Sequence, residues 1–298
     1  MIALSSSAAS SAAPILPAPG SGAQVASLVA ASVHIKDVPA NLVPALTSTT
    51  PDTPAKYFPA TRVSCIGMNR CAYGKLDSRR VVLVLGDSHA RMWLPALVPA
   101  AVHFGFRLVL QWLPACPTAL VAVLEPATGH PYYECSKFRR LAIADVRRLS
   151  PELVLLTDRT ANARDVLGHQ IPNILWRIGE EQMISSLRSP RTHVAIIGDV
   201  TRFTLALPGC LGAYPTNIQR CSVPNPNPVF NSHSSAELSA AAALGVPYIN
   251  PQPWLCRNVC SPIVGHFVAY YDAQHVSATY AAFLSNLLGS RVRQLIWR

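Results

Sequence analysis

The segment VVLVLGDSHARMW, residues 81–93, joins an apolar run to a polar turn. Residues 81–85 are five consecutive apolar residues, a pattern typical of a strand that is buried on both faces. Gly86, Asp87, Ser88 and His89 follow the run, and a helix-like stretch begins after them. The segment therefore predicts a strand that turns directly into a helix, with a serine at the turn.

Four further apolar runs repeat this pattern. They cover residues 107–111, 153–157, 193–197 and 246–249, and helix-like stretches lie at residues 91–103, 136–149, 174–187, 236–244 and 277–288. Alternating strands and helices predict five parallel strands with helices on both faces, because parallel strands need long crossovers. Sites in such sheets form beyond the carboxyl ends of the strands, where Ser88 falls. Pro95 and Pro99 predict a short or kinked first helix.

The composition indicates a globular protein with a weakly structured beginning. The chain has 298 residues, of which 50% are hydrophobic and 13% are charged, so it can bury a large core. No apolar run approaches the roughly 18 residues of a membrane span. Residues 1–60 are rich in Ala, Ser, Pro and Thr and have almost no aromatic residues, which predicts a low-complexity linker or disordered tail. We expect the folded domain to cover residues 61–298.

The formal net charge of +10 does not form a nucleic-acid motif. The basic residues are scattered, and no long basic run or aromatic-interleaved RNA motif accompanies them. The sequence therefore argues against a nucleic-acid partner, and the charge fits a weak attraction to anionic envelope polymers equally well.

The eight cysteines favour disulfides over a metal site. They are Cys65, Cys71, Cys116, Cys135, Cys210, Cys221, Cys256 and Cys260. Pairing each with its neighbour along the chain is the simplest hypothesis among many connectivities. The spacings C-x5-C and C-x3-C do not match zinc motifs, so we expect no metal and no cofactor.

Disulfides predict an extracytoplasmic protein. Residues 1–30 nevertheless contain no Lys or Arg and no compact apolar segment of a secretory signal. Two explanations stay open: the signal is unusual, or the chain is the exported part of a longer system. A cytoplasmic esterase with reduced cysteines is the weaker alternative.

Ser88 is a candidate nucleophile. A serine is a weak nucleophile until a base removes its proton and preformed donors receive the charge on the acyl oxygen. A strand-to-helix turn exposes the hydroxyl and leaves N–H groups free, so Ser88 N–H is the first oxyanion donor we expect and Gly86 permits the turn. The alternative is that Asp87 only caps the helix and Ser88 has no chemical role.

The segment YYDAQHVSATYAAFL, residues 270–284, supplies a candidate base. Asp272 lies three residues before His275, so its carboxylate can orient the imidazole as in a Ser-His-Asp triad. The alternatives are that Asp272 or Ser277 caps the last helix and that His275 lies on the surface. The order Ser88, Asp272, His275, with the serine and the pair near opposite ends of the domain, favours catalysis.

Other polar residues lie at the same edge of the predicted sheet. After Ser88, the side chains of His89, Arg91 and Trp93 either border a pocket or are residues of the first helical turn. Their position next to the serine does not decide between these two roles.

Two further strands end in polar residues. Asp158, Arg159 and Asn162, in LLTDRTAN at residues 155–162, are candidates for a second oxyanion donor or a substrate clamp. Asp199 follows the fourth strand, and we expect a turn or cap role for it.

The two motifs together resemble a known family. GDSH at 86–89 and DAQH at 272–275 are similar to the first and last sequence blocks of the SGNH hydrolases, in particular the domain at the C-terminus of membrane acyltransferase-3 proteins. The segments CAYGKLDSRRVVLVLGDSHARMWLPAL (71–97), ACPTAL (115–120), PGCLGAYP (208–215) and PWLCRNVCSPIVG (253–265) agree. The resemblance covers roughly residues 37–290.

The resemblance implies a three-layer αβα fold of SGNH or flavodoxin-like type, with a mostly parallel five-stranded sheet. It implies Ser88 as nucleophile, His275 as base and Asp272 as the residue that orients it. It also implies an extracytoplasmic domain that acts with a multi-span membrane half. The usual Gly and G-x-N-D blocks are not visible, and TDRTAN occupies about the place of the latter, so Arg159 or Asn162 is expected to substitute.

The leading hypothesis is a serine acyltransferase or esterase of the SGNH type. It would act through an acyl-enzyme on acyl esters of cell-envelope glycans, with a carbohydrate or glycolipid acceptor and a membrane-embedded acyltransferase as partners. The alternative is a catalytically inactive module that binds envelope glycans or assists assembly.

Overall fold

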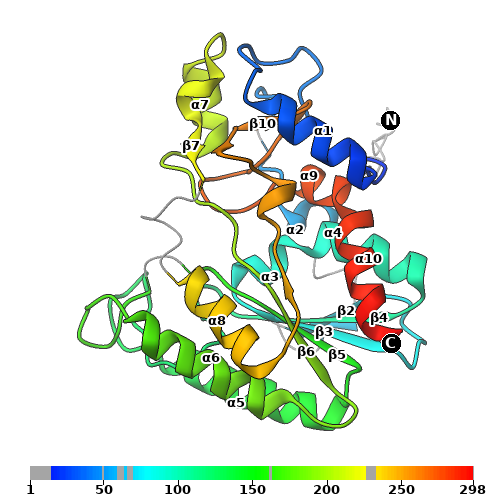
Figure 1. The fold of residues 1–298 in the computed structure, drawn as a ribbon, viewed down its shortest axis with the longest axis vertical. Helices are drawn as coiled ribbons and strands as arrows, with labels where there is room; N and C mark the ends of the chain where they lie inside the picture. The colour runs from blue at the N-terminus through cyan, green and yellow to red at the C-terminus, as the bar shows by residue number, and fades with distance from the viewer. Residues whose placement is uncertain are drawn as a thin grey trace, which may run out of the picture.

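A seven-stranded sheet forms the centre of the computed structural model, which describes residues 15–48, 50–58, 64–65, 70–160, 163–225 and 233–297 (Figure 1). The strand order is β1-β2-β4-β3-β5-β6-β8. The strands are β1 (Ser64–Cys65), β2 (Arg70–Gly74), β3 (Val81–Gly86), β4 (Arg107–Trp112), β5 (Leu153–Thr157), β6 (His193–Ile197) and β8 (Tyr248–Ile249).

Five of these strands are the predicted parallel ones. β3 pairs in parallel with β4 and β5, β5 with β6, and β6 with β8. The predicted strand count of five is too low, because β2 pairs antiparallel with β4 and β1 antiparallel with β2. These two strands lie at the edge of the sheet and lack a continuous apolar run, so periodicity does not reveal them.

The strand order creates a crevice beside β3. The chain passes from β3 to β4 on one side and then crosses to β5 on the other side. In doubly wound sheets, ligands bind at the carboxyl ends of the strands where the winding direction changes. The ends of β3 and β5 therefore bracket the place where a site is expected.

Helices cover both faces of the sheet (Figure 1). One face carries α5 (Tyr133–Leu149), α6 (Asn173–Leu187) and α8 (Ser234–Leu244), and the other carries α4 (Leu94–Phe104), α9 (Ala278–Phe283) and α10 (Ser285–Ile296). Successive side chains of a strand point to opposite faces. Val81, Leu83 and Leu85 accordingly pack with the α5, α6 and α8 core, whereas Val82 and Val84 belong to the other core. The three-layer α/β fold is confirmed.

The helix predicted after β3 is broken in two. The short helix α3 (Ser88–Met92) ends at Trp93, and α4 begins at Leu94 with Pro95 in its first turn. Proline fits the first turn of a helix because its missing N–H has no partner there. Pro99 lies inside α4. The expectation of a short or kinked helix is confirmed.

The segment before β1 differs from the predicted tail. α1 (Gly22–Ser32) buries Val25 and Val29, and α2 (Pro54–Tyr57) follows it. The helix α1 starts in a capping box between Ser21 and Gln24. Its apolar residues four apart form a buried stripe that the Ala- and Ser-rich composition conceals. Residues 1–14, 49 and 59–63 lie outside the described part, and the domain boundary near residue 60 stays a prediction.

Small elements form the end of the molecule beyond α3. Figure 1 shows α1, α7 (Leu207–Ala213), β7 (Val223–Pro224) and β10 (Ile263–Val264) together there. β7 pairs with β9 (Val259–Cys260), and β10 pairs with β11 (Phe267–Val268).

Disulfides join Cys116 to Cys135, Cys210 to Cys221, and Cys256 to Cys260, as predicted.

The fourth predicted disulfide involves residues at the edge of the sheet. Cys71 is disulfide-bonded, and it lies opposite Cys65 in the β1–β2 ladder. The side chain of Cys65 is outside the described residues, so this pairing stays a prediction.

Within the described residues, none of the helices combines the length and the apolar character that crossing a bilayer requires.

Candidate active site

Ser88 lies at the junction between β3 and α3. Asp87 is the N-cap of α3, and its Oδ1 accepts a hydrogen bond from His89 N at 2.8 Å. Gly86 is needed because a Cβ there would clash with the main-chain oxygen of Thr157 on β5. Its φ is not in the left-handed region, so close approach of the two strands, and not a left-handed turn, requires the glycine. The strand end thus presents the Ser88 hydroxyl at the crevice.

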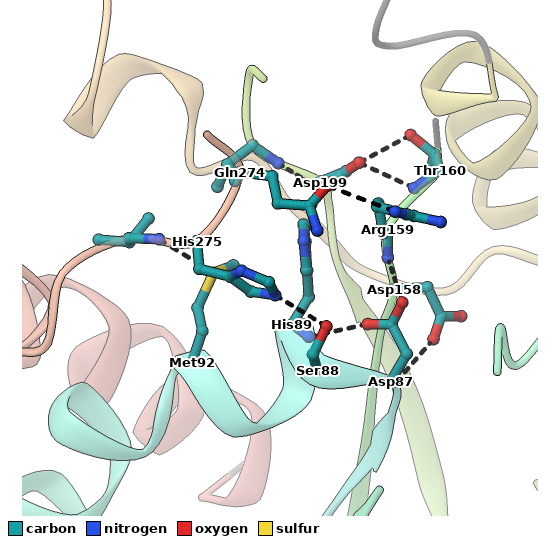
Figure 2. Close-up of polar contacts among 12 residues, drawn as sticks. Asp87, Ser88, His89, Met92, Asp158, Arg159, Thr160, Asp199, Gln274 and His275 are labelled. Carbon is teal, nitrogen blue, oxygen red and sulfur yellow. Dashed lines mark hydrogen bonds and ion pairs between the residues drawn. The ribbon is translucent and has the colours of Figure 1, made fainter. Parts of the chain in front are cut away.

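The structure brings Ser88, His275 and Asp272 into one line of hydrogen bonds. His275 Nε2 lies 2.8 Å from Ser88 Oγ, and His275 Nδ1 lies 2.7 Å from Asp272 Oδ2. Figure 2 shows the His275 ring directed at the serine hydroxyl. These are the contacts through which a base takes the hydroxyl proton and a carboxylate orients the base.

The loop around His275 holds this geometry. Asp272 Oδ1 accepts the main-chain N–H groups of Gln274 and His275, each at 2.8 Å. The ring of Tyr271 stacks on the imidazole with centroids 5.3 Å apart and an interplanar angle of 5°. Burial alone would raise the pKa of Asp272, but His275 and the two N–H donors outweigh it and lower the pKa below its usual range. Asp272 is therefore an ionised partner for the imidazole.

Asp87 connects the ends of β3 and β5. Besides capping α3, its Oδ2 accepts the main-chain N–H of Arg159 at 3.2 Å, and its own N–H donates to Asp158 Oδ1 at 3.2 Å. The cap role weighed for Asp87 is thus present. The cap also fixes the backbone from which Ser88 projects, so it is compatible with the role predicted for Ser88.

Asp158 has a structural role instead of the predicted contact with substrate. It is 1% exposed, and its Oδ2 accepts hydrogen bonds from the main-chain N (2.6 Å) and the hydroxyl of Thr118. Burial, together with the charges of Asp87 and Glu180, raises the pKa of Asp158 well above its ordinary value. Asp158 therefore anchors the loop after β4 to the strand ends.

Arg159 lines a cavity together with Asp87. Its main-chain N–H is taken by Asp87, and its Nη1 lies 3.4 Å from Gln274 Oε1 on the His275 loop. A cavity of about 320 Å³ is lined by Asp87, Arg159, Glu125 and apolar residues such as Val123. The role of Arg159 as a substrate clamp stays a prediction, and Asn162 lies outside the described residues.

The residues after Ser88 divide into three environments. Trp93 is fully buried in the core, so the prediction that it borders a pocket is wrong. Arg91 is partly exposed, with its guanidinium 4.9 Å from the ring centroid of Trp112. His89 is 1% exposed, and its Nδ1 lies 2.8 Å from Asp199 Oδ1.

Asp199 and Tyr271 make contacts near the site that were not predicted from the sequence. Asp199 was expected to serve a turn, and it does bond to Val200 N, but it also binds His89 and Thr160. Its position after a parallel strand, equivalent to that of Asp158, was the available signal. Tyr271 is adjacent to Asp272 in YYDAQH, and no sequence signal shows its stacking on His275.

The described residues offer one candidate for an oxyanion donor. Ser88 occupies the first position of α3, so its main-chain N–H has no acceptor within the helix. His89 N and Arg159 N both donate to Asp87 and are not available. Neither of these two main-chain N–H groups can therefore serve as the second oxyanion donor.

A comparison with known protein families finds a match over most of the chain. Residues 54–289 match the SGNH domain that is fused to AT3 domains. No curated protein sequence matches the chain.

Three solved structures are similar. The periplasmic domain of a lipopolysaccharide acetyltransferase from Salmonella ser. Paratyphi A is 18% identical over 73% of this chain and 85% of its own, with a TM-score of 0.57. A lipase/acylhydrolase from Enterococcus faecalis is 13% identical over 72% and 96%, with a TM-score of 0.41. A possible lipase from Chitinophaga pinensis DSM 2588 is 11% identical over 72% and 98%, with a TM-score of 0.39.

Proposed function

The chain belongs to the SGNH domains that are fused to AT3 domains, and on that basis we propose that it is a serine-dependent O-acyltransferase or esterase. The observation that carries the proposal is the unbroken contact from Ser88 Oγ to His275 Nε2 and from His275 Nδ1 to Asp272. A catalytic role accounts for this alignment at the switch point of the sheet, whereas a binding module would not need it.

The reaction has two steps. Ser88 Oγ attacks the acyl carbonyl carbon while His275 Nε2 takes the hydroxyl proton, and Ser88 N–H donates to the developing oxyanion. His275 then gives the proton to the leaving oxygen, which leaves an acyl ester on Ser88. In the second step His275 takes a proton from a sugar hydroxyl or water, that oxygen attacks the ester, and the proton returns to Ser88 Oγ. Transfer and hydrolysis differ only in the acceptor.

The proposed place of action is outside the cytoplasm. Three disulfides support an oxidising compartment, and the family is one whose members are fused to AT3 domains. We propose that the acyl group comes from a membrane-embedded acyltransferase partner and goes to a hydroxyl of a cell-envelope glycan. The cavity lined by Asp87 and Arg159 is large enough for one sugar ring.

A fluorophosphonate probe tests the serine mechanism. We expect the probe to label the folded protein and to fail on Ser88→Ala. Ser78→Ala is the matched control. Ser78 precedes the start of β3, at the other end of the strand from Ser88, and its hydroxyl donates to Gly105 O. Full labelling of Ser88→Ala, or no labelling of folded wild-type protein, would leave the alternative of an inactive glycan-binding module.

A further inference from the structure

The loop that carries the triad histidine is a short hairpin of residues 269–277, the His275 hairpin. Tyr271 N donates to His275 O at 3.0 Å near the tip, and Ser277 N donates to Ala269 O at 3.0 Å at the base. The helix α9 follows the second arm directly. The position of His275 in the site therefore depends on what holds the base of this hairpin to the rest of the domain.

A segment near the N-terminus, residues 43–48 and 50–52, contacts both sides of this base, and we call it the strap. Its first residue lies beside β11, which leads into the first arm of the hairpin. Val43 N donates to His266 O at 2.8 Å, and Val268 N donates to Val43 O at 2.9 Å. These two main-chain bonds attach the start of the strap to the chain immediately before the first arm.

Asp52, the last residue of the strap, holds the other side of the base and is 2% exposed. Its main-chain oxygen accepts the N–H of Ala278 at 2.9 Å, and its Oδ2 accepts the N–H (3.0 Å) and the hydroxyl (2.6 Å) of Thr279. Its Oδ1 accepts the hydroxyl of Tyr57 at 2.9 Å. Both oxygens of the carboxyl group are thus bonded, and Asp52 fixes the first turn of α9, which begins three residues after His275.

Other contacts hold the tip and the second arm of the hairpin. Phe203 N donates to Ala273 O at 2.6 Å, and the ring centroid of His89 lies 4.9 Å from that of His275. A main-chain N–H of the second arm lies 3.3 Å from the sulfur of Met92. These contacts come from α3 and from the loop after β6, whereas five hydrogen bonds to the strap hold the base from both sides.

We infer that the strap holds His275 within reach of Ser88, and that Asp52 is a positioning residue for the His275 hairpin. Within the described part of the chain, the Asp52 side chain bonds to Thr279 and Tyr57 and not to the triad, so it acts through the start of α9. A displacement of about 1 Å between reacting groups can cost on the order of a hundredfold in rate. This role rests on the proposed function. Part of the segment that the sequence predicts to be a linker then supports the site.

Asp52→Ala and Asp52→Asn test this role through the rate of fluorophosphonate labelling. Alanine removes both side-chain acceptors, so we expect the rate constant at saturating probe to fall roughly thirtyfold and the half-saturating probe concentration to change less than about twofold. Asparagine can accept both bonds from Thr279 and donate to Tyr57, so it should restore the rate to within about threefold of wild type. A rate for Asp52→Ala within about threefold of wild type overturns the inference.

Ser21→Ala is the matched control for a general loss of stability. Ser21 caps α1 and accepts from Gln24 N at 3.2 Å, so its substitution also removes a hydrogen bond at a helix N-terminus, and it belongs to neither the strap nor the hairpin. Both alanine variants should lower the melting temperature, whereas only Asp52→Ala should slow labelling. An equal loss of rate in the two variants overturns the inference, because position would then not be the cause.

Hydrogen exchange follows the hairpin without reference to activity. We expect the amides of Tyr271 and Ser277 to exchange about tenfold faster in Asp52→Ala than in wild type, and at the wild-type rate in Ser21→Ala. Unchanged exchange in a slowed Asp52→Ala would mean that Asp52 does not act through the hairpin, and the inference would be wrong.

A milder variant covers the case in which Asp52→Ala does not fold. Thr279→Val deletes the hydroxyl that donates to Asp52 and keeps the main-chain bond between the two residues. We expect it to slow labelling by about three- to tenfold and to speed the exchange of the same two amides. Labelling and exchange that both match wild type in this variant overturn the inference.

The two proposals fail in different ways. If Ser88→Ala is labelled like wild type, the proposed function fails, and the exchange of the Tyr271 and Ser277 amides still shows whether Asp52 holds the hairpin. If labelling depends on Ser88 but neither its rate nor the exchange responds to Asp52→Ala, only the inference fails.

Discussion

Two histidine–carboxylate pairs touch each other in this protein and differ in almost every other respect. Asp272 of the first pair is 37% exposed in its side chain and lies on a loop, and its histidine reaches Ser88. Asp199 of the second pair is 2% exposed and follows β6, and its histidine reaches no further hydrogen-bond partner within the described part of the chain. The same two residue types thus contact a hydroxyl in one pair and are enclosed by the protein in the other.

The comparison predicts the largest effect for the pair that reaches Ser88. Asp272→Asn should lower the rate of ester hydrolysis by about 10³- to 10⁴-fold, because an amide does not stabilise the charged imidazole or select its tautomer. Stability should change little, since the amide oxygen can still accept the N–H groups of Gln274 and His275. Steady-state kinetics and a thermal melt check both parts. A rate within tenfold of wild type would mean that Asp272 does not act on His275 during the reaction.

For the buried pair we expect the main effect of substitution on stability. His89→Gln leaves the Asp199 carboxylate buried without its charged partner, which costs about 3 kcal/mol of unfolding free energy. Asp199→Asn should cost less, because His89 can release its proton and become neutral. Urea unfolding at pH 6 measures both. Equal stability of His89→Gln and wild type would show that the pair contributes no net stabilisation.

The pH dependence of that loss follows from the direction of each pKa shift. The raised pKa of His89 means that its contribution is complete below its ordinary value of 6.5 and is lost as the pH rises through the folded-state value. The lowered pKa of Asp199 means that its contribution is complete above 3.8 and is lost as the pH falls through the folded-state value. The difference between Asp199→Asn and wild type should therefore be largest between about pH 4 and 6.5.

The contrast between the pairs also shows what the sequence can predict. The parallel strands and the junction at Ser88 follow from local patterns, since apolar runs and GDSH are contiguous in the chain. Asp272 and His275 are three residues apart, so their contact is local as well. The pair of His89 and Asp199 is not local, because 110 residues separate its members and only the strand order brings the ends of β3 and β6 together.

The Ala- and Ser-rich composition of the N-terminal segment conceals a helix that packs on the domain. α1 is rich in Ala and Ser, yet Val25 and Val29 are buried against the domain. An Ala-rich helix needs few large side chains when its partner surface already exists, and no local pattern in the chain describes that surface. The short strands β1 and β2 escaped prediction for the same reason, since an edge strand depends on the neighbour that it pairs with.

The smallest predicted effect concerns a third histidine, which is buried without a carboxylate. Burial lowers the pKa of His233 to about 4, so the folded protein keeps it neutral between pH 4 and 6.5 while the unfolded chain binds a proton there. His233 therefore makes stability rise with pH across this window, opposite in sign to the contribution of His89. Replacing His233 with Gln, which can still bond to Asn173, should flatten the slope by up to one proton, as measured by urea unfolding at several pH values. If the slope of unfolding free energy against pH is the same as in wild type, the His233 ring takes up its proton in the folded state as well. The difference between His233 and His89 would then not be caused by the carboxylate that pairs with His89.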